Sequence, residues 1–365
     1  MRLSRTRFEA AALAMMLAAG TAGVGAQSPA GDRAARPAAG QSARAAIERW
    51  LDVQAAAIQA RYRRVETSAG IVAANHMQDS LLLRTRVKFD AKGRYGLAST
   101  LQTGNSFTGS WNNVGWGTGG PRTTGVYLKH LYLSAEPVRG FEITYGSLGF
   151  VRGESTEITT YDNDGYMLGG RATIHRPDRL FFDEISVALG FFGDPAEPGF
   201  SDRASNLGSV NFHHVLAGKK IGPLLGLSAD YTNQDSAGTV RAAAGVRTPR
   251  AKVVDLVRYE QYCRVQRLPA CGLAATAEKA VHSRVTVSGG YADVDPDFGG
   301  VNGDRYTRGK RVFEQVSVRL FRDLTVIGFA TQAFHNDFAV ANAKRLDLVV
   351  SYNALGPLQR AGFFR

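Results

Sequence analysis

Alternation of apolar and polar positions dominates the chain from residue 65 onward. Segment 81–90 shows it best, because one face carries three cations while the other carries Leu, Thr, Val and Phe. The three cations are Arg84, Arg86 and Lys88. Successive side chains of a strand point to opposite faces, so the pattern predicts a strand whose cationic face meets water, since unpaired charge is costly in lipid or in a dry core.

Similar two-faced segments recur along the chain, at 141–145, 184–191, 225–231, 284–291 and 315–320. Short turns are predicted between segments at 91–93, 137–140, 218–223, 249–250, 281–283 and 321–323. Other connections are long and polar, at 104–125, 152–165, 194–210, 293–308 and 334–343. Short turns on one side and long loops on the other are typical of a barrel that crosses a membrane, whereas a soluble sandwich gives no reason for them.

The strand count supports closure. About 15 strands follow residue 80, and if the turn at 91–93 is periplasmic, the first of them descends toward the periplasm. An ascending strand must precede it, and residues 65–76 are predicted to supply it. The total becomes 16, within a range of 14–18, which is even as a single-chain barrel requires. The predicted fold class is therefore all-β, a closed antiparallel transmembrane barrel over residues 65–365.

Residues 43–64 are predicted to form an amphipathic helix ahead of the barrel. Apolar residues, among them Trp50, Leu51, Ile58 and Tyr62, recur there at three- and four-residue spacing. The helix could lie on the periplasmic rim, enter the barrel as a plug, or contact a neighbouring subunit.

The first 26 residues are predicted to be a cleavable export signal. Arg2, Arg5 and Arg7 precede a short apolar stretch, and Val24-Gly25-Ala26 gives the small-x-small cleavage pattern. Residues 27–42, rich in Ala, Gly, Pro and Ser, are predicted to be a flexible leader. No later apolar run approaches the roughly 20 residues that a helical span needs, so a membrane-embedded chain would have to be a closed barrel.

Composition narrows the function classes. The net charge of +12 becomes +10 without the three arginines and one glutamate of the signal. The basic residues are spread along the strands, which argues against a nucleic-acid partner. Catalytic and phosphate-binding motifs are not found, so we expect no enzyme and no cofactor.

Two cysteines, Cys263 and Cys271, flank Leu268-Pro269. In an oxidising compartment they could form a disulfide at a hairpin tip, or they could be free thiols. Two cysteines alone are too few ligands for a metal site. Acidic loop residues leave calcium binding open at Asp293, Asp295, Asp297, Asn302 and Asp304, and likewise at Asp162-Asn163-Asp164-Gly165.

The last strand carries the most specific resemblance to a known family. Residues 346–352 read Leu-Asp-Leu-Val-Val-Ser-Tyr and alternate like the C-terminal assembly signal of outer-membrane barrels. The chain departs from that family in ending on Phe363-Phe364-Arg365 after a Gly356-Pro357 break. Over residues 65–365 the chain resembles porin-type outer-membrane β-barrels of Gram-negative bacteria, within a porin-like subgroup of them. The resemblance implies outer-membrane lipid as surroundings, small hydrophilic solutes as cargo, and a homotrimer as one possible assembly.

A charge filter is predicted on the inward faces. Its nine residues are Arg84, Arg86, Lys88, Glu142, Arg171, Glu184, Asp230, Arg284 and Arg319. Six cations against three anions would favour anion passage, although mixed charges could also only solvate and brace a lumen. We therefore expect a porin-like channel for passive diffusion of small hydrophilic solutes, with a preference for anionic solutes if the filter is selective. The alternatives are a non-conducting barrel acting as adhesin, receptor or scaffold through its external loops, and a secreted soluble β-protein.

Overall fold

Strands dominate the chain. The computed structural model describes residues 47–362 except 107–108, 157–164, 176–179, 195, 236, 249–252, 266–269, 296–308, 335–339 and 341. Its strands are β1 (Leu51–Glu66), β2 (Val72–Lys88), β3 (Tyr95–Thr103), β4 (Asn112–Gly117), β5 (Val126–Val138), β6 (Phe141–Gly149), β7 (Tyr166–Ile174), β8 (Glu184–Phe191), β9 (Phe212–Ile221), β10 (Leu225–Gln234), β11 (Ala237–Arg247), β12 (Leu256–Arg264), β13 (Cys271–His282), β14 (Val285–Val294), β15 (Gly309–Arg319), β16 (Leu324–Ala333) and β17 (Lys344–Asn353). The short helices are α3 (Phe200–Arg203), η1 (Ala204–Asn206) and α4 (Leu355–Arg360).

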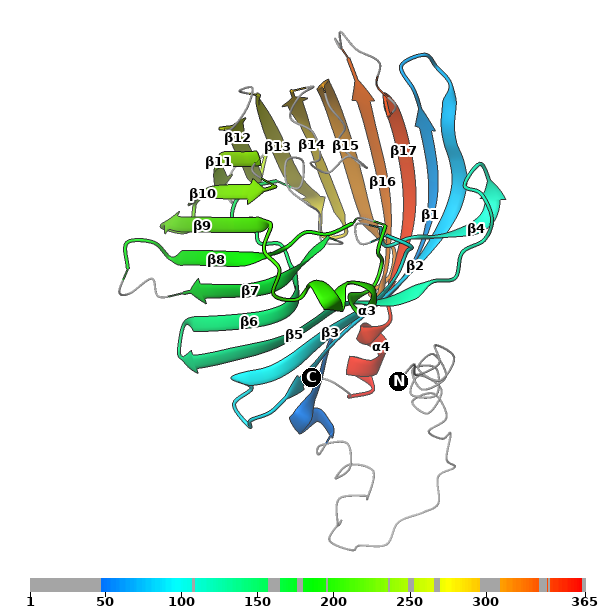
Figure 1. Ribbon diagram of the computed structural model, residues 1–365. Coiled ribbons are helices and arrows are strands. Elements are labelled where there is room, and N and C mark those ends of the chain that lie inside the picture. The colour runs from blue at the N-terminus through cyan, green and yellow to red at the C-terminus, as the bar shows by residue number, and fades with distance from the viewer. Residues whose placement is uncertain are drawn as a thin grey trace, which may run out of the picture. The chain divides into compact units, whose positions relative to one another are not determined.

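Sixteen of these seventeen strands form a closed wall, as predicted (Figure 1). Each wall strand pairs antiparallel with the next, and β17 pairs with β1 over Ala57–Glu66 to close the ring. The exception is β4, which lies in the loop between β3 and β5 and pairs with the upper part of β2. Over the described strands, every wall strand thus has a paired neighbour on both sides, as a barrel in lipid requires.

Connections alternate in length between the two ends of the barrel, which confirms the predicted pattern. At the turn end, β2–β3, β5–β6, β9–β10 and β13–β14 are joined by short turns. At the loop end, 104–125, 192–211 and 295–308 are long. The connections near 235–236 and 265–270 are short yet lie at the loop end. No helix in the described residues is long and apolar enough to cross a membrane.

The predicted helix at 43–64 is wrong from residue 51 onward. Residues 47–50 form a helical turn, residues 43–46 lie outside the described part, and residues 51–66 are strand β1. The first ascending wall strand is therefore β1, not 65–76, and the barrel begins at Leu51 rather than at residue 65. Pairing with β2 on one side and β17 on the other overrides the helix preference of an Ala-rich segment.

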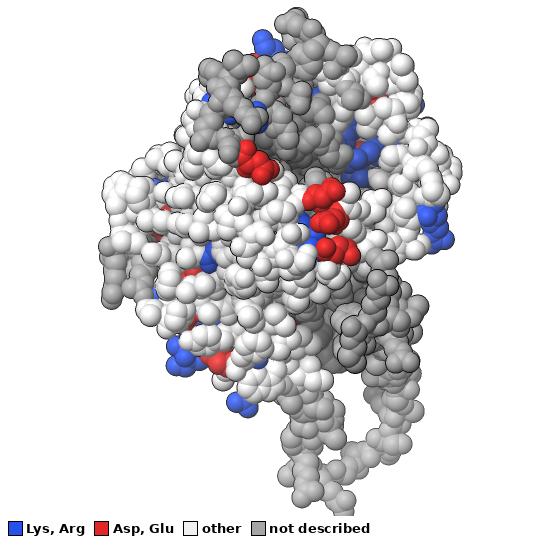
Figure 2. Space-filling view, viewed as in Figure 1, with Lys and Arg blue, Asp and Glu red and all other residues white. Residues whose placement is uncertain are grey.

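The wall has two chemically different faces. Outward residues such as Leu189, Leu346 and Leu348 are exposed apolar side chains, each 48–49 % exposed. Residues between them point inward and include buried polar groups such as Ser186, Arg345 and Asp347. Uncharged side chains dominate the surface over β5 to β9 in Figure 2. This distribution suits a wall with hydrocarbon outside and polar groups inside.

Aspartates directly before three strands fasten the turn end. Asp183 accepts the backbone N–H of Lys220, Asp255 accepts that of Ala280 at 2.8 Å, and Asp323 is paired with Arg360 of α4. Each contact ties a turn to a neighbouring element, and the last one fixes the C-terminal helix beneath the barrel. The pKa of each carboxyl is held below its ordinary value, chiefly by the Lys220 N–H for Asp183, by the Lys279 ammonium for Asp255 and by the Arg360 guanidinium for Asp323.

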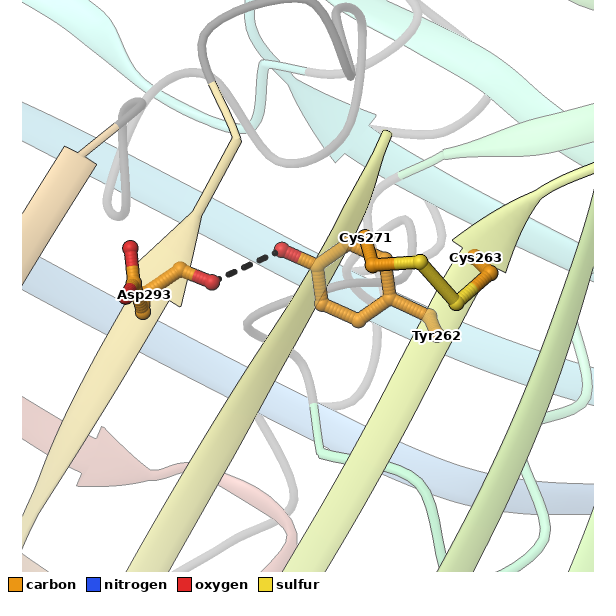
Figure 3. Close-up of a disulfide and its surroundings, with 4 residues drawn as sticks. All are labelled: Tyr262, Cys263, Cys271 and Asp293. Atoms are coloured by element: carbon orange, nitrogen blue, oxygen red, sulfur yellow. Dashed lines mark hydrogen bonds between the residues drawn. A yellow bond between two sulfur atoms is a disulfide. The ribbon is translucent and has the colours of Figure 1, made fainter. Parts of the chain in front are cut away.

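A disulfide joins β12 to β13 at the loop end. Cys263 and Cys271 are directly opposite in the register and their sulfurs are bonded (Figure 3). On the other face of β12, the hydroxyl of Tyr262 donates to the carbonyl oxygen of Asp293 at 3.3 Å, which links this hairpin to β14. The disulfide therefore fastens a corner of the wall that is also packed from inside by Tyr262.

Candidate functional site: the lumen and its inward-folded segment

A segment after β6 folds into the barrel. Residues 152–156, which we call the constriction segment, begin with a tight turn in which Ser155 N–H donates to Arg152 O at 3.0 Å and Gly153 has a φ of +56°. The backbone N–H of Glu154 donates to Ser228 Oγ at 2.8 Å, and that of Thr156 donates to Glu260. Because Ser228 and Glu260 lie on the inner faces of β10 and β12, the segment lies against the inside of the wall.

An aromatic cluster fills the neighbouring part of the loop end. Phe150 lies 5.4 Å from Phe212 and 5.9 Å from Phe192, measured between ring centroids. Phe200 of α3 and Leu207 pack against the same buried cluster. These contacts bring the connections 150–156 and 192–211 into the mouth of the barrel. The open part of the lumen is therefore narrower than the ring of sixteen strands alone would leave.

The wall beneath the constriction segment carries a buried polar group of its own. Asp230 on β10 is 5 % exposed and pairs with Arg241 on β11, whose Nη2 lies 2.7 Å from Oδ1. His214 Nε2 on β9 lies 3.6 Å from the same oxygen. The hydroxyl of Ser155 donates to Asp230 Oδ2 at 3.5 Å. Pairing with a cation and hydrogen bonding make this buried carboxylate tolerable, and they also connect it to the segment.

Three arginines converge on one carboxylate where β1 meets β17. Asp347 accepts from Arg345 Nε at 3.0 Å and from Arg63 Nε at 3.2 Å. Arg61 Nη1 lies 3.8 Å from the same carboxylate. All four residues are less than a tenth exposed, and their side chains face inward. Three arginines and one aspartate therefore share this stretch of the inner face, and we call the group the arginine cluster.

Aromatic rings support the arginine cluster. The guanidinium of Arg61 lies 4.0 Å from the ring centroid of Trp111, which precedes β4. The guanidinium of Arg345 lies 5.6 Å from the ring of Phe329 on β16. Cation–π contacts and the hydrogen bond from Arg61 Nε to Gln78 at 3.0 Å hold the planar groups in place. These contacts thus hold the guanidinium groups of the arginine cluster in a defined geometry.

The arginine cluster and the constriction segment lie on opposite walls. In the closed order of sixteen strands, β1 and β10 are separated by eight positions in either direction. The segment and the wall beneath it bring three carboxylates to their side, those of Glu154, Asp230 and Glu260, together with Arg241 and Arg247. The arginine cluster therefore faces a mixed-charge surface across the lumen. The resulting difference in charge between the two walls produces an electric field that acts on passing ions.

Most of the nine predicted filter residues lie on the inner face. Arg84, Arg86, Arg171 and Asp230 lie within the wall, and Arg86 Nη2 donates to the buried Ser134 at 3.0 Å. Lys88, Glu142, Glu184 and Arg319 are also on inward positions, near the turn end. Arg284 is the exception, because it lies in the exposed turn between β13 and β14 rather than in a strand. Their part in ion selection stays a prediction.

The arginine cluster was missed from sequence. Arg61 and Arg63 lie within the segment interpreted as a helix, although their spacing of two is itself a strand signal. Arg345 and Asp347 alternate in the same way within the last strand. Whether a loop folds inward was left open, because no local pattern shows where the tip of a loop will pack. Of the acidic loop residues, Asp297, Asn302 and Asp304 lie outside the described residues, as do residues 162–164.

Comparison with known proteins gives a structural likeness alone. No protein-family model matches the chain, and no curated protein matches it. Among solved structures, OmpF of Salmonella typhi in complex with daunomycin aligns with a TM-score of 0.53 at 12 % identity, over 84 % of this chain and 98 % of that one. OprB of Pseudomonas putida at low pH aligns with a TM-score of 0.51 at 11 % identity, over 89 % of this chain and 99 % of that one.

The likeness and the geometry agree on architecture. Both compared porins are covered almost completely, so the likeness extends around the whole ring rather than over one sheet. The sixteen-strand closure, the alternation of turns and loops and the two-faced wall were established from the chain itself. With fold and topology in agreement, this chain has the fold of the porin-type outer-membrane β-barrels.

Proposed function

We propose that the chain is a channel of a Gram-negative-type outer membrane that passes small hydrophilic solutes by passive diffusion. The observation that carries this proposal is a polar, charged inner face in a closed wall whose outer face is apolar. A sixteen-strand ring encloses an aqueous passage when side chains do not fill it, and the constriction segment narrows that passage. Export through the signal at residues 1–26 is part of the proposal.

A preference for anions is the finer part of the proposal. Arg61, Arg63 and Arg345 bring three guanidinium groups to one side of the lumen, around the carboxylate of Asp347. Rings and ladders of charge set the sign of the ions that a pore admits most readily. Small carboxylates and phosphates are the solute class that this surface favours.

Reversal potentials in a planar bilayer under a salt gradient test both parts. The reversal potential of the parent channel is expected to have the sign that indicates anion selectivity. Arg63→Gln is expected to shift the reversal potential toward cation selectivity. Arg64→Gln is the matched control, because it removes the same charge one residue away. Arg64 lies on the outer face, where its Nη2 is paired with Glu66 Oε1 at 2.8 Å. Cation preference in the parent would overturn the anion proposal.

A non-conducting barrel is the second candidate function. The buried Phe192 and Phe212 at the loop end, with Phe150 packed against them, favour it, since apolar side chains in the mouth exclude water. Such a barrel would act as adhesin, receptor or scaffold through its external loops. Correctly folded protein that gives no single-channel steps in the bilayer would support this candidate over the channel.

Assembly as a homotrimer is proposed by analogy with porins. Chemical cross-linking of the protein in its native membrane, followed by electrophoresis without heating, tests it. A ladder that ends at three chains is the expected result, and a single-chain band at every cross-linker concentration would contradict it.

A further inference from the structure

Two glycines face each other on the inner wall beneath the constriction segment. Gly226 of β10 and Gly245 of β11 are directly opposite in the register and both are buried. A Cβ atom on either glycine would come well under 3.0 Å from the carboxylate of Glu154, from Oε1 at position 226 and from Oε2 at position 245. Only glycine at both positions leaves the room that the carboxylate occupies.

Paired glycines are unfavourable in a strand interior. They lose more conformational entropy on folding than other residues and offer no side chain for packing, so a glycine there often marks a close approach by another group. In this wall the approaching group is the Glu154 side chain, which is 13 % exposed. The glycine pair is therefore explained by the Glu154 side chain that packs against it rather than by the needs of the strands.

The fit is steric more than ionic. Among the described residues, Glu154 has one ion pair, to Arg247 at 3.8 Å, and the arginine side chain is 42 % exposed. A pair of that length and exposure contributes little. The backbone beside it is held more firmly, because the N–H of Glu154 donates to Ser228 Oγ at 2.8 Å and Ser155 reaches Asp230. The carboxylate adds a contact across β10 and β11 that these hydrogen bonds do not make.

We propose that Gly226 and Gly245 form a seat for the Glu154 carboxylate, and that Glu154 is the positioning residue that keeps the constriction segment against the wall. A segment opens less easily when a side chain lodged between strands adds to the hydrogen bonds of its backbone. The consequence for ion flow rests on the proposed channel function, whereas the placement of the segment does not.

The structure offers a way to empty the seat without unfolding the wall. The atoms that an alanine Cβ would meet at position 226 belong to the Glu154 side chain, with its carboxylate nearest. Gly226→Ala should therefore displace that side chain and leave the strand pairing intact. Gly218→Ala is the matched control: it adds the same methyl group on the inner face of neighbouring β9, where the nearest atoms are at ordinary contact distances of 3.8 and 3.9 Å.

Thiol accessibility tests the placement without any current. Ser155 is 8 % exposed, so a cysteine placed there (Ser155→Cys) is expected to react slowly with a water-soluble maleimide in the folded barrel. Adding Gly226→Ala, Gly245→Ala or Glu154→Ala should accelerate labelling about tenfold, as expected when a local contact that suppresses opening is removed. Gly218→Ala should leave the rate unchanged. Equal rates in all backgrounds, or equal acceleration by the control, would overturn the proposal.

Coupling between the two partners gives a second readout. If the glycines act only through Glu154, the double variant Gly226→Ala with Glu154→Ala should label no faster than Glu154→Ala alone. Additive acceleration would contradict the seat. In bilayer recordings the same variants should show more frequent current substates than the parent. Absence of current in every variant, with the labelling pattern intact, would reject the channel function and leave the seat standing.

Discussion

Arg61 on the first wall strand lies 3.8 Å from the carboxylate of Asp347 on the last one, so the seam that closes the barrel is also a charged site in the lumen. Ile58 to Glu66 pair with Lys344 to Tyr352 across this seam. The same carboxylate binds Arg63 and Arg345. Ring closure and the local charge of the inner face therefore depend on a shared set of side chains.

Replacement of Asp347 by Asn is expected to destabilise the closed barrel. Asp347 is 2 % exposed, and its loss leaves three buried guanidinium groups without their common anion. Removal of one partner from a buried charge cluster lowers the free energy of unfolding by about 3 kcal/mol or more. On gel electrophoresis, a folded barrel and its unfolded chain migrate as separate bands. The heating temperature at which the folded band converts to the unfolded band should fall for the variant. Ser351→Asn, four residues away on the same inner face, is the control and should change it little.

The two faces of β17 predict opposite responses to the same charge. Leu348→Glu places a carboxylate on the outer face, where Leu348 is 48 % exposed between Gly328 and Tyr62. In a bilayer this should lower the free energy of unfolding by about 2 kcal/mol. Val349→Glu places it on the inner face opposite Arg61 and should cost little. Urea titration of barrels folded into lipid vesicles measures both, and equal costs would contradict a lipid-facing outer wall.

Acid is expected to loosen the turn end. The pKa of Asp255 is lowered from 3.8 in the folded chain, first by the hydrogen bond from Lys279 and then by that from the Ala280 N–H. A carboxyl whose pKa is lower when folded stabilises the fold above its unfolded pKa, and the stabilisation is lost as pH falls through the folded pKa. The difference in urea midpoint between the parent and Asp255→Asn should be largest near neutral pH and vanish once the pH is below the folded pKa of Asp255. A gap that persists in acid would exclude this cause, and Lys279→Met should reproduce the loss at neutral pH.

Reduction of the disulfide should have a local effect. Cys263 and Cys271 are eight residues apart in sequence, and a cross-link of so short a loop stabilises by about 2–3 kcal/mol in the chain-entropy account. The loop at 265–270 should become sensitive to protease after reduction, while the barrel stays folded because β12 and β13 remain paired along their length. Cys263→Ser with Cys271→Ser should behave like the reduced parent, and global unfolding on reduction would contradict this account.

Period-two alternation and the lengths of connections were enough to predict the barrel class, the strand number and the inward direction of Arg84, Arg86 and Asp230. These are properties of neighbouring residues, since a strand exposes alternate side chains to opposite faces wherever it lies. The same reasoning failed at Leu51–Glu66. There the Ala-rich sequence satisfies both a helical and a strand pattern, and only its pairing with β2 and β17 decides between them.

Tertiary structure alone determined the site. Arg61 and Asp347 are far apart in sequence, and their contact exists because the first and last strands meet when the ring closes. The burial of Glu154 over Gly226 and Gly245 likewise depends on where a loop tip packs, which is fixed by shape across the lumen and leaves no periodic signal. Local sequence therefore set the direction in which each side chain points, and closure of the ring set which of those side chains meet.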